Sequence, residues 1–405
     1  MPDISFEKEQ HSSIDQELES LLQKQSARIK VVGCGGGGGN SVSRMKEVGV
    51  KGCEVIALNT DAQDLLYTTV DHKILIGREL THGLGAGSNP KVGEEAARES
   101  ETEIKKRISN SDMVFITCGL GGGTGTGASP MIASIAREMG ALTVAVVTKP
   151  FSFEGAQRKD LADKGFEELR DKVDTIITVQ NDRLLQIIDK KTSLLDAFSR
   201  CDEVLQQGVQ GIAELITIPG LVNVDFADVK SIMSETGSAL MGIGIGEGEN
   251  RTIDAAKQAI SSPLLDMNIE GARGILFTVT GGKNLGMHEV NEAAKIITAS
   301  ADPNAKIIFG ANIDESMKDE VKITVVATGF NENVRSNAPE EVSAEKSSYR
   351  PSQFLQKERI SEMDRLQERP AEEKEDVKNR ADDIFGQSDD PDLDVPAFIR
   401  KKIKK

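Results

Sequence analysis

Two glycine-dense stretches decide the fold of this chain: Gly-Cys-Gly-Gly-Gly-Gly-Gly-Asn-Ser-Val at residues 33–42 and Gly-Leu-Gly-Gly-Gly-Thr-Gly-Thr-Gly at residues 119–127. Each follows a short apolar run, Ile29–Val32 or Met113–Cys118, and each precedes a segment with helical spacing. A strand, a glycine turn and a helix in this order bring backbone N–H groups close to a phosphate, where a side chain would block the approach. Two such turns on separate strands of one domain indicate a nucleotide polyphosphate held from two sides.

Strand-like and helix-like segments alternate from Arg28 to about Thr178. This alternation predicts an α/β fold, a doubly wound parallel sheet with helices on both faces and ligands at the carboxyl ends of the strands. Both glycine turns follow such strand ends. The predicted strands are Ile29–Val32, Glu54–Leu58, Lys73–Ile76, Met113–Thr117, Thr143–Val147 and Thr175–Val179, and helical spacing covers Pro90–Ile108 and Pro130–Met139.

The second half of the chain predicts a long helix from Leu194 to Thr217, which Pro219-Gly220 ends, and then a smaller α+β domain. Its expected strands are Gly237–Gly246, Gly274–Thr280, Lys306–Ala311 and Val321–Thr328, with helices near Arg251–Ser261 and Leu285–Ser300. The chain is thus divided into a polar extension (1–27), a nucleotide-binding domain (28–193), a central helix (194–217), an α+β domain (218–330), a flexible linker (331–391) and a C-terminal docking peptide (392–405). The linker is rich in charged residues and poor in large apolar ones, so it cannot bury a core.

Composition excludes several functions. The net charge of −16 opposes nonspecific binding to nucleic acid or anionic membranes, and an aromatic content of 4% without Trp argues against base-stacking platforms. No apolar run approaches the ~20 residues that span a bilayer. The four cysteines lack metal-binding or disulfide spacing, and Cys34 is interpreted as a small residue in a tight turn. The sequence therefore predicts a cytoplasmic protein that binds no nucleic acid and does not span a membrane.

Other phosphate motifs fit the two turns less well. Gly33, Gly35 and Gly38 match G-x-G-x-x-G, but the acidic residue that a dinucleotide site needs comes late, at Asp61. Such a site also has no use for the second turn. A P-loop is excluded because neither turn ends in Gly-Lys-Ser/Thr. Two rivals remain open: an NAD-type oxidoreductase and a scaffold that binds nucleotide without hydrolysing it.

The second turn and a third glycine segment suggest how the phosphates are held. The hydroxyls of Thr124 and Thr126 suit β- and γ-phosphate oxygens and the ligand shell of a magnesium ion. The third segment, residues 83–90, precedes a predicted helix and is expected to close on the γ-phosphate. It would then distinguish a triphosphate from a diphosphate.

A series of segments closely resembles the FtsZ family of bacterial cell-division GTPases, relatives of tubulin: VGCGGGGGNSV, ALNTDAQ, GLGAGSNPKVG, GLGGGTGTGASP, VTKPFSFEG, NDRLL, LLDAFSRCDEVL, PGLVNVDFADV and LDVPAFIRKK. The resemblance covers residues 28–330 and resumes at 392–402. GGGTGTG is highly specific to the tubulin-like superfamily, and NVDFADV with the terminal peptide points to FtsZ within it. One departure is Gln180, where the family commonly has Pro, so that loop is expected to shift slightly.

The resemblance implies a site for GTP or GDP with Mg²⁺, the metal being held mainly by phosphates and water. Asn181 and Asp202 would hydrogen-bond guanine, because a carboxylate accepts from its N1–H and exocyclic amine, and Phe198 would stack on it. Glu154 and Arg158 would hold the ribose and phosphate side. The remaining implied contacts are Gly35, Gly36, Gly37, Gly38, Gly39 and Asn40, then Asn59, Thr60 and Asp61, then Ala86, Gly87 and Asn89, and then Gly121, Gly122, Gly123, Thr124, Gly125, Thr126 and Gly127.

No glycine turn carries a group to orient the attacking water, which GTP hydrolysis requires. In the family this group comes from the next subunit, which assigns catalysis here to Asp225 and Asp228, with Asn223 beside them. Locally, Asp225 and Asp228 also fit a helix cap with a favourable first-turn carboxylate. On the local sequence alone, the helix cap is the favoured interpretation. Because the nucleotide site lacks a catalytic group of its own, the catalytic role becomes the favoured one.

The resemblance implies assembly and partners as well. A nucleotide face that docks on the acidic loop of a neighbour is head-to-tail and non-closing, so it builds a homopolymeric filament, and hydrolysis then loosens the contact. The filament would form the division (Z) ring at mid-cell. The terminal peptide Leu393–Lys402 would dock on membrane-anchoring and regulatory division proteins.

Overall fold

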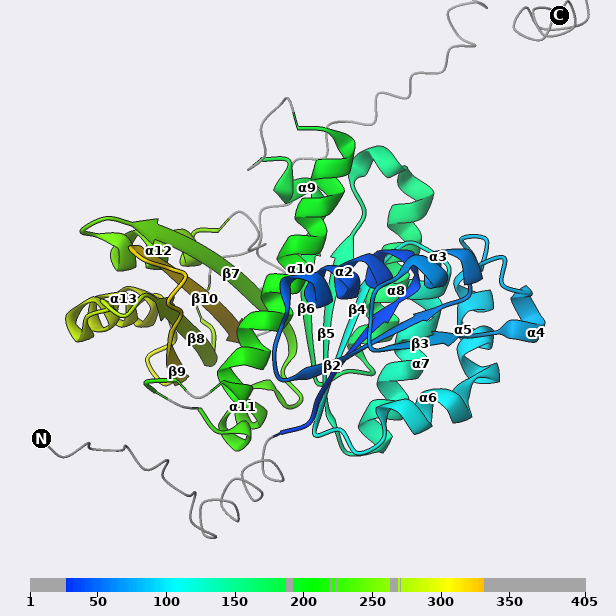
Figure 1. Ribbon diagram of the computed structural model, residues 1–405, viewed down its shortest axis with the longest axis horizontal. Helices are drawn as coiled ribbons and strands as arrows, with labels where there is room; N and C mark the ends of the chain where they lie inside the picture. The colour runs from blue at the N-terminus through cyan, green and yellow to red at the C-terminus, as the bar shows by residue number, and fades with distance from the viewer. Residues whose placement is uncertain are drawn as a thin grey trace, which may run out of the picture. The chain divides into compact units, whose positions relative to one another are not determined.

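A ten-stranded sheet with the strand order β3-β2-β1-β4-β5-β6-β7-β10-β8-β9 organises the computed structural model (Figure 1). The structure describes residues 27–186, 192–218, 220–222, 224–262, 269 and 271–330. The strands are β1 (Ile29–Cys34), β2 (Cys53–Asn59), β3 (His72–Leu75), β4 (Met113–Gly119), β5 (Leu142–Lys149), β6 (Thr175–Gln180), β7 (Gly237–Glu247), β8 (Gly274–Gly281), β9 (Lys306–Ile313) and β10 (Glu320–Thr328).

Helices cover this sheet on both faces. They are α2 (Gly35–Val48), α3 (Ala62–Tyr67), α4 (Arg78–Thr81), α5 (Pro90–Glu99), α6 (Glu101–Ile108), α7 (Thr124–Glu138), α8 (Ala156–Arg170), α9 (Asn181–Leu184), α10 (Leu194–Thr217), α11 (Phe226–Met233), α12 (Arg251–Ile260) and α13 (Met287–Ala299), with the 3₁₀ turn η1 (Ser152–Glu154).

Strands β1 to β6 form the predicted doubly wound parallel sheet, with the order 3-2-1-4-5-6. Side chains of a strand alternate between its faces, and neighbours Val31 and Val32, both fully buried, lie in different cores. One core is shared with α2 and α10, and the other with α5, α6, α7 and α8. The chain order reverses between β1 and β4, which is where this class of sheet binds ligands.

The predicted central helix is α10, with the expected bounds. Ser193 caps its first turn, because its hydroxyl accepts the Asp196 amide at 3.1 Å. Leu205, Val209 and Ile212, spaced by four and three residues, are buried against the sheet. The helix therefore forms one wall of the nucleotide-binding half and leads the chain to the second half.

The second half continues the same sheet. Strand β7 pairs with β6 in parallel at Thr175–Ile177 and then with β10 in antiparallel orientation over Leu240–Glu247. Helices α12 and α13 cover one face of this part with a third apolar core. The predicted α+β region is thus present, and its sheet is joined to the parallel sheet through β7.

Two helix predictions need correction. The stretch 90–108 is two helices, because Ser100 ends α5 and begins α6 while its hydroxyl accepts the Gly77 amide at 3.1 Å. Both helices begin within the glycine-dense stretches: α2 begins at Gly35, and α7 begins at Thr124 instead of near Pro130. The glycines at the start of α2 therefore belong to its first turns.

Candidate functional site

The two glycine-rich helix starts lie directly against each other at the carboxyl ends of the neighbouring strands β1 and β4. A Cβ atom added to Gly35 would lie 2.9 Å from the Gly125 nitrogen, and one added to Gly125 would lie 3.0 Å from the Cys34 oxygen. Gly35 also has a φ of 69°, in the left-handed region that favours glycine. The contact brings the positive ends of α2 and α7 together, as an anion site requires.

The glycines of the two stretches have two different roles, close backbone packing and open space beside the pocket. A Cβ on Gly38 would lie 2.5 Å from the Thr117 oxygen, and one on Gly127 only 1.8 Å from the Pro90 oxygen, so backbone packing excludes side chains there. Around Gly37 the nearest atom would be at 3.4 Å, and around Gly122 at 4.0 Å. The expectation that these glycines serve ligand approach is therefore incomplete, since Gly38 and Gly127 are also required for packing.

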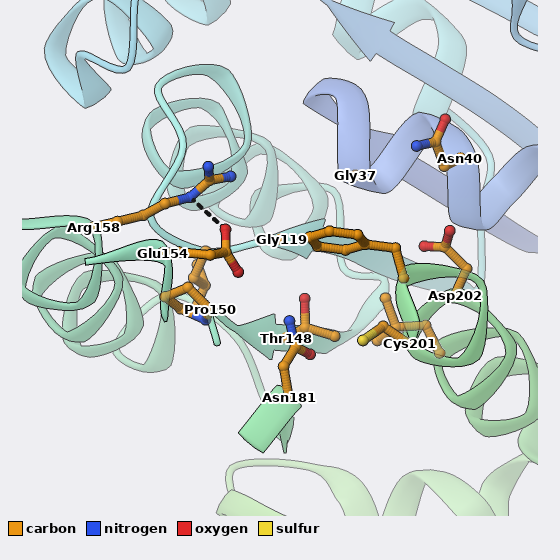
Figure 2. Close-up of a pocket in the computed structure, with 13 residues that line it drawn as sticks. Gly37, Asn40, Gly119, Thr148, Pro150, Glu154, Arg158, Asn181, Cys201 and Asp202 are labelled. Atoms are coloured by element: carbon orange, nitrogen blue, oxygen red, sulfur yellow. Dashed lines mark ion pairs between the residues drawn. The ribbon is translucent and has the colours of Figure 1, made fainter. Parts of the chain in front are cut away.

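A pocket opens beside these helix starts (Figure 2). Glu154 and Arg158 line one side of it, and Cys201 and Asp202 of α10 line the other. The predicted residues that the structure brings together here are Gly37, Asn40, Glu154, Arg158, Asn181, Phe198 and Asp202; those that the sequence analysis missed are Gly119, Leu120, Thr148, Pro150, Cys201 and Leu205. Thr148 and Pro150 stand at the carboxyl end of β5 and within the family-like segment VTKPFSFEG, and these two signals could have identified them.

The α9–α10 side of the pocket offers hydrogen-bond acceptors. Asn181 is 5% exposed, and among the described residues its Oδ1 has no hydrogen-bond partner. A buried acceptor without a partner is costly unless a ligand supplies a donor. Asp202 accepts from the Ser41 hydroxyl at 2.8 Å, and burial raises the pKa of this carboxyl to about 6.

An aromatic side chain and an ion pair complete the wall. The ring of Phe198 is 38% exposed and meets Phe151 edge to face, with 5.4 Å between the ring centroids. The Arg158 guanidinium lies 3.2 Å from the Glu154 carboxylate, which also accepts the Phe151 amide at 2.8 Å. Gln180 ends β6 with extended backbone angles of φ −86° and ψ 114°, just before Asn181.

The predicted residues after β2 form a separate hydrogen-bonded group. The Asn59 amide donates to Asp64 at 2.6 Å, and Asp61 caps α3 by accepting the Gln63 and Asp64 amides. Burial, with Asp61 as a like charge, raises the pKa of Asp64. The Asp64 carboxylate lies 3.3 Å from where a Cβ on Gly36 would be, which brings an acid that the sequence analysis missed to the start of α2.

The third glycine segment lies against the second. A Cβ on Gly123 would lie 2.8 Å from the Asn89 nitrogen and 2.9 Å from the Ala86 Cβ, and Asn89 caps α5. Gly87 has a φ of 56° and no neighbour within 4 Å of an added Cβ. The structure therefore brings all three predicted glycine segments to one edge of the sheet.

The two threonine hydroxyls that are expected to meet phosphate oxygens each have a hydrogen-bond partner within the chain. Thr124 Oγ1 lies 2.6 Å from Thr60 Oγ1, and Thr126 Oγ1 accepts the Gly121 amide at 2.9 Å. Both side chains are buried. In this structure they hold the turns together, and the positive helix ends are left to meet an anion.

Cys34 is buried at the end of β1, and burial raises the pKa of its thiol above the ordinary value. A thiol that stays protonated is a poor nucleophile, which favours the interpretation of Cys34 as a small turn residue. Among the residues that the structure describes, no cluster of three or more His, Cys, Asp or Glu side chains is placed to hold a metal. No helix in the same ranges is long and apolar enough to cross a membrane.

Helix α11, which Asp225 caps and which carries Asp228, lies at the amino ends of the parallel strands, where its Met233 carbonyl accepts the hydroxyl of Thr175, the first residue of β6. Helix α9, which carries Asn181 of the pocket, lies at the opposite ends of these strands (Figure 1). Asp225 caps α11 by accepting the Asp228 amide at 2.7 Å, and both side chains are exposed. On the same helix, Lys230 acts electrostatically on Asp112, which precedes β4 at the amino ends of the strands. Asn223 lies outside the described residues. One chain therefore does not bring its own acids to its pocket.

The fold, the paired helix starts and the pocket define a nucleotide-binding protein of the doubly wound class. Residues 28–189 match the Tubulin/FtsZ family, GTPase domain, and residues 237–331 match the FtsZ family, C-terminal domain. The chain is similar to an FtsZ dimer from M. jannaschii, described as empty, with 51% identity and a TM-score of 0.75 over 78% of this chain and 92% of that one.

A single-site FtsZ mutant from M. jannaschii gives 50% identity and a TM-score of 0.74, covering 79% of this chain and 96% of that one. A GTPγS-bound protofilament of CetZ2 from Haloferax volcanii shares the fold, with 20% identity and a TM-score of 0.64 over 76% and 96% of the two chains. The chain belongs to the FtsZ family, and with it to the tubulin-like GTPases.

Proposed function

We propose that this chain binds GTP in the pocket between α2, α8, α9 and α10 and polymerises head to tail. It hydrolyses GTP when the acidic loop of a neighbouring subunit reaches that pocket. The observation that carries the proposal is that Asp225 and Asp228 belong to α11, at the amino ends of the parallel strands, whereas the pocket is lined by residues at their carboxyl ends. A protein built in this way completes its active site only by contact with a second copy.

Guanine recognition is supported by the acceptors at one end of the pocket. The unpaired Oδ1 of Asn181 and the Asp202 carboxylate suit the N1–H and exocyclic amine of guanine, which adenine does not present in the same way. Phe198 offers an exposed ring for stacking. GTP is therefore the expected nucleotide over ATP.

The start of α2 and the glycine segments suit the phosphates, since a Cβ added to Gly37, Gly87 or Gly122 would meet no atom closer than 3.4 Å. A Mg²⁺ ion bound with the nucleotide would neutralise phosphate charge, and it would be held mainly by phosphates and water. This chain would supply amides to the phosphates and acceptors to the base. Its neighbour would supply the carboxylates that orient water.

Exposed apolar side chains support contact at both ends. Leu195 is 80% exposed and Leu194 61% exposed at the start of α10, next to the pocket, and Leu221 is 68% exposed just before α11. Large apolar side chains that gather in an exposed patch mark contact surfaces. A contact between the start of α10 in one copy and the start of α11 in the next would bury these leucines against each other.

The cellular role follows from the family. We propose that the filaments form the division (Z) ring in the cytoplasm at mid-cell, and that Leu393–Lys402, outside the described residues, recruits membrane-anchoring and regulatory division proteins. The domain boundaries given in the sequence analysis are kept as part of this proposal. The extension 1–27 and the linker 331–391 also lie outside the described residues, with Ala27 as the exception.

GTP turnover per subunit, measured across protein concentration, tests the proposal. We expect turnover to rise steeply above a threshold concentration, together with light scattering that GTP, but not GDP or NADH, induces. A rate per subunit that stays constant with concentration would contradict activation by a neighbour. Assembly without phosphate release would favour a non-hydrolysing scaffold instead.

GTP affinity should depend on pH through Asp202, whose pKa burial raises to about 6, against the lowering effects of Ser41 and Arg44. The carboxylate accepts guanine N–H groups, so affinity is full above this pKa and falls as pH drops through it, by up to about tenfold per pH unit. Dissociation constants between about pH 5 and 8 check this. Asp202→Asn, which does not titrate, should remove the dependence, and a variant that keeps it would contradict the assignment.

A further inference from the structure

Helix α2, whose first turn faces the phosphate site, also holds the base-binding carboxylate on α10. Ser41 is fully buried, and its Oγ lies 2.8 Å from Asp202 Oδ1 and 3.0 Å from the Gly37 carbonyl oxygen of its own helix. A hydroxyl has one proton to donate, and an ionised carboxylate is the stronger acceptor. The Ser41 proton is therefore best placed on Asp202.

Arg44 stands three residues further along α2, on the same face. Its Nη1 donates to Ser199 Oγ at 2.9 Å, and its Nε is buried without a hydrogen-bond partner among the described residues. Its positive charge favours the ionised form of Asp202. Two side chains of α2, a hydroxyl and a cation, thus act on one carboxylate of α10.

The other charged groups around Asp202 either repel its negative charge or are paired with each other. Asp202 and Asn40 line both the main pocket and an adjoining polar pocket, which Arg44 lines together with the acids Glu47 and Asp64. In the main pocket, Glu154 and Arg158 are paired with each other. On its own helix, Asp202 adjoins the buried thiol of Cys201. Ser41 and Arg44 are therefore the groups that oppose the burial of this carboxylate.

We infer that Ser41 and Arg44 are positioning residues that fix the Asp202 carboxylate for recognition of the purine base. The helix that presents amides to the phosphates then also sets base specificity. This inference rests on the proposed function, and it adds two residues that touch neither the phosphates nor the base. A neutral or turned Asp202 would lose its second acceptor contact with guanine, the one to the exocyclic amine.

A purely structural tie between α2 and α10 is the alternative. These helices already pack through buried apolar side chains of the same core, including Val42, Met45 and Leu205. Loss of a tie would lower thermal stability and affect all nucleotides alike. Loss of a positioning contact would instead change the preference between guanine and a base without the exocyclic amine.

The test compares dissociation constants of GTP and inosine triphosphate, which lacks that amine, for the wild-type chain, Ser41→Ala, Ser41→Thr and Arg44→Gln. Ser43→Ala is the matched control, since Ser43 lies on α2 but its hydroxyl accepts the Thr69 amide at 2.9 Å. In Ser41→Ala and in Arg44→Gln we expect the preference for GTP to fall about tenfold at about pH 7, where the wild-type carboxylate is still ionised, and to recover largely above about pH 8. Ser41→Thr should restore it, and Ser43→Ala should keep it.

Two results would overturn the inference, and they differ from each other. If Ser41→Ala keeps the wild-type preference at every pH while the wild-type chain binds GTP tightly, the positioning role is wrong and the proposed function stands. If the wild-type chain does not prefer GTP over inosine triphosphate at all, both the assignment of Asp202 and this inference are wrong. A thermal unfolding scan of each variant shows whether a lost preference comes from a lost fold.

Discussion

Asp228→Asn should lower GTP turnover by about a hundredfold or more while leaving GTP affinity unchanged. The side chain is exposed on α11, at the amino ends of the strands, whereas the pocket lies at their carboxyl ends, so its loss should leave nucleotide binding in its own chain intact. Replacing the carboxylate removes the group proposed to orient water in the neighbour's pocket. Steady-state phosphate release and nucleotide titration on the same preparation measure the two effects separately.

Asp254→Asn is the matched control, because Asp254 is also an exposed acid in the first turn of a helix, α12. Its turnover should equal that of the wild-type chain. Asp225→Asn is a useful companion, since Asn keeps the cap that Asp225 provides to α11 while it removes the charge. Normal turnover in both the Asp225 and Asp228 variants would show that the water is oriented by other groups.

Mixing two inactive variants isolates the contribution of the neighbour. Asp228→Asn keeps the pocket and lacks the acid, whereas Asn181→Leu keeps the acid and lacks the buried acceptor for the base. At a junction where the pocket of the first meets α11 of the second, both parts are intact. We expect the mixture to recover turnover that neither variant has alone, and a mixture as inactive as its components would contradict an active site shared between subunits.

The sequence predicted the parallel half of the fold because its signals are local. Strands buried on both faces read as short apolar runs, as at Ile29–Cys34, and each is followed by a turn or helix within a few residues. The bounds of α10 were predictable for the same reason, since its buried face repeats over many turns and Pro219 follows it. Family resemblance then identified most of the pocket.

What the sequence could not show depends on contacts between distant segments. The pairing of Thr175–Ile177 with Gly237–Ala239 joins the two halves into one sheet, and nothing near either strand signals it. Ser41 of α2 gains its role from Asp202 of α10, and Asp64 of α3 gains its role from the start of α2. Thr148 gains its role because the end of β5 lines the pocket. Each of these roles depends on a contact between segments that are distant in sequence. The packing role of the glycines is equally hidden, since the atom that excludes a side chain belongs to a distant segment, as the Thr117 oxygen of β4 does for Gly38 of α2.

The adjacent glycines Gly37 and Gly38 should separate binding from folding. Gly38→Ala places a methyl carbon 2.5 Å from the Thr117 oxygen and 2.9 Å from the Gly33 carbonyl carbon, both of them backbone. Neither can move without shifting a central strand, so we expect a loss of about 3 kcal/mol or more in the free energy of unfolding. Gly37→Ala meets its nearest neighbour at 3.4 Å, an ordinary contact, and it lines the pocket.

Both changes add the same methyl group to the same helix, where alanine is favoured over glycine by about 1 kcal/mol. Gly37→Ala should therefore unfold at or above the wild-type temperature. Its GTP affinity should fall about tenfold or more, because the methyl group reduces the space for the phosphates in the pocket. Thermal unfolding without nucleotide, followed by GTP titration, measures both quantities for each variant. If Gly38→Ala folds normally, the packing role read from its neighbours is wrong; if Gly37→Ala binds GTP as the wild-type chain does, α2 does not approach the phosphates at that residue.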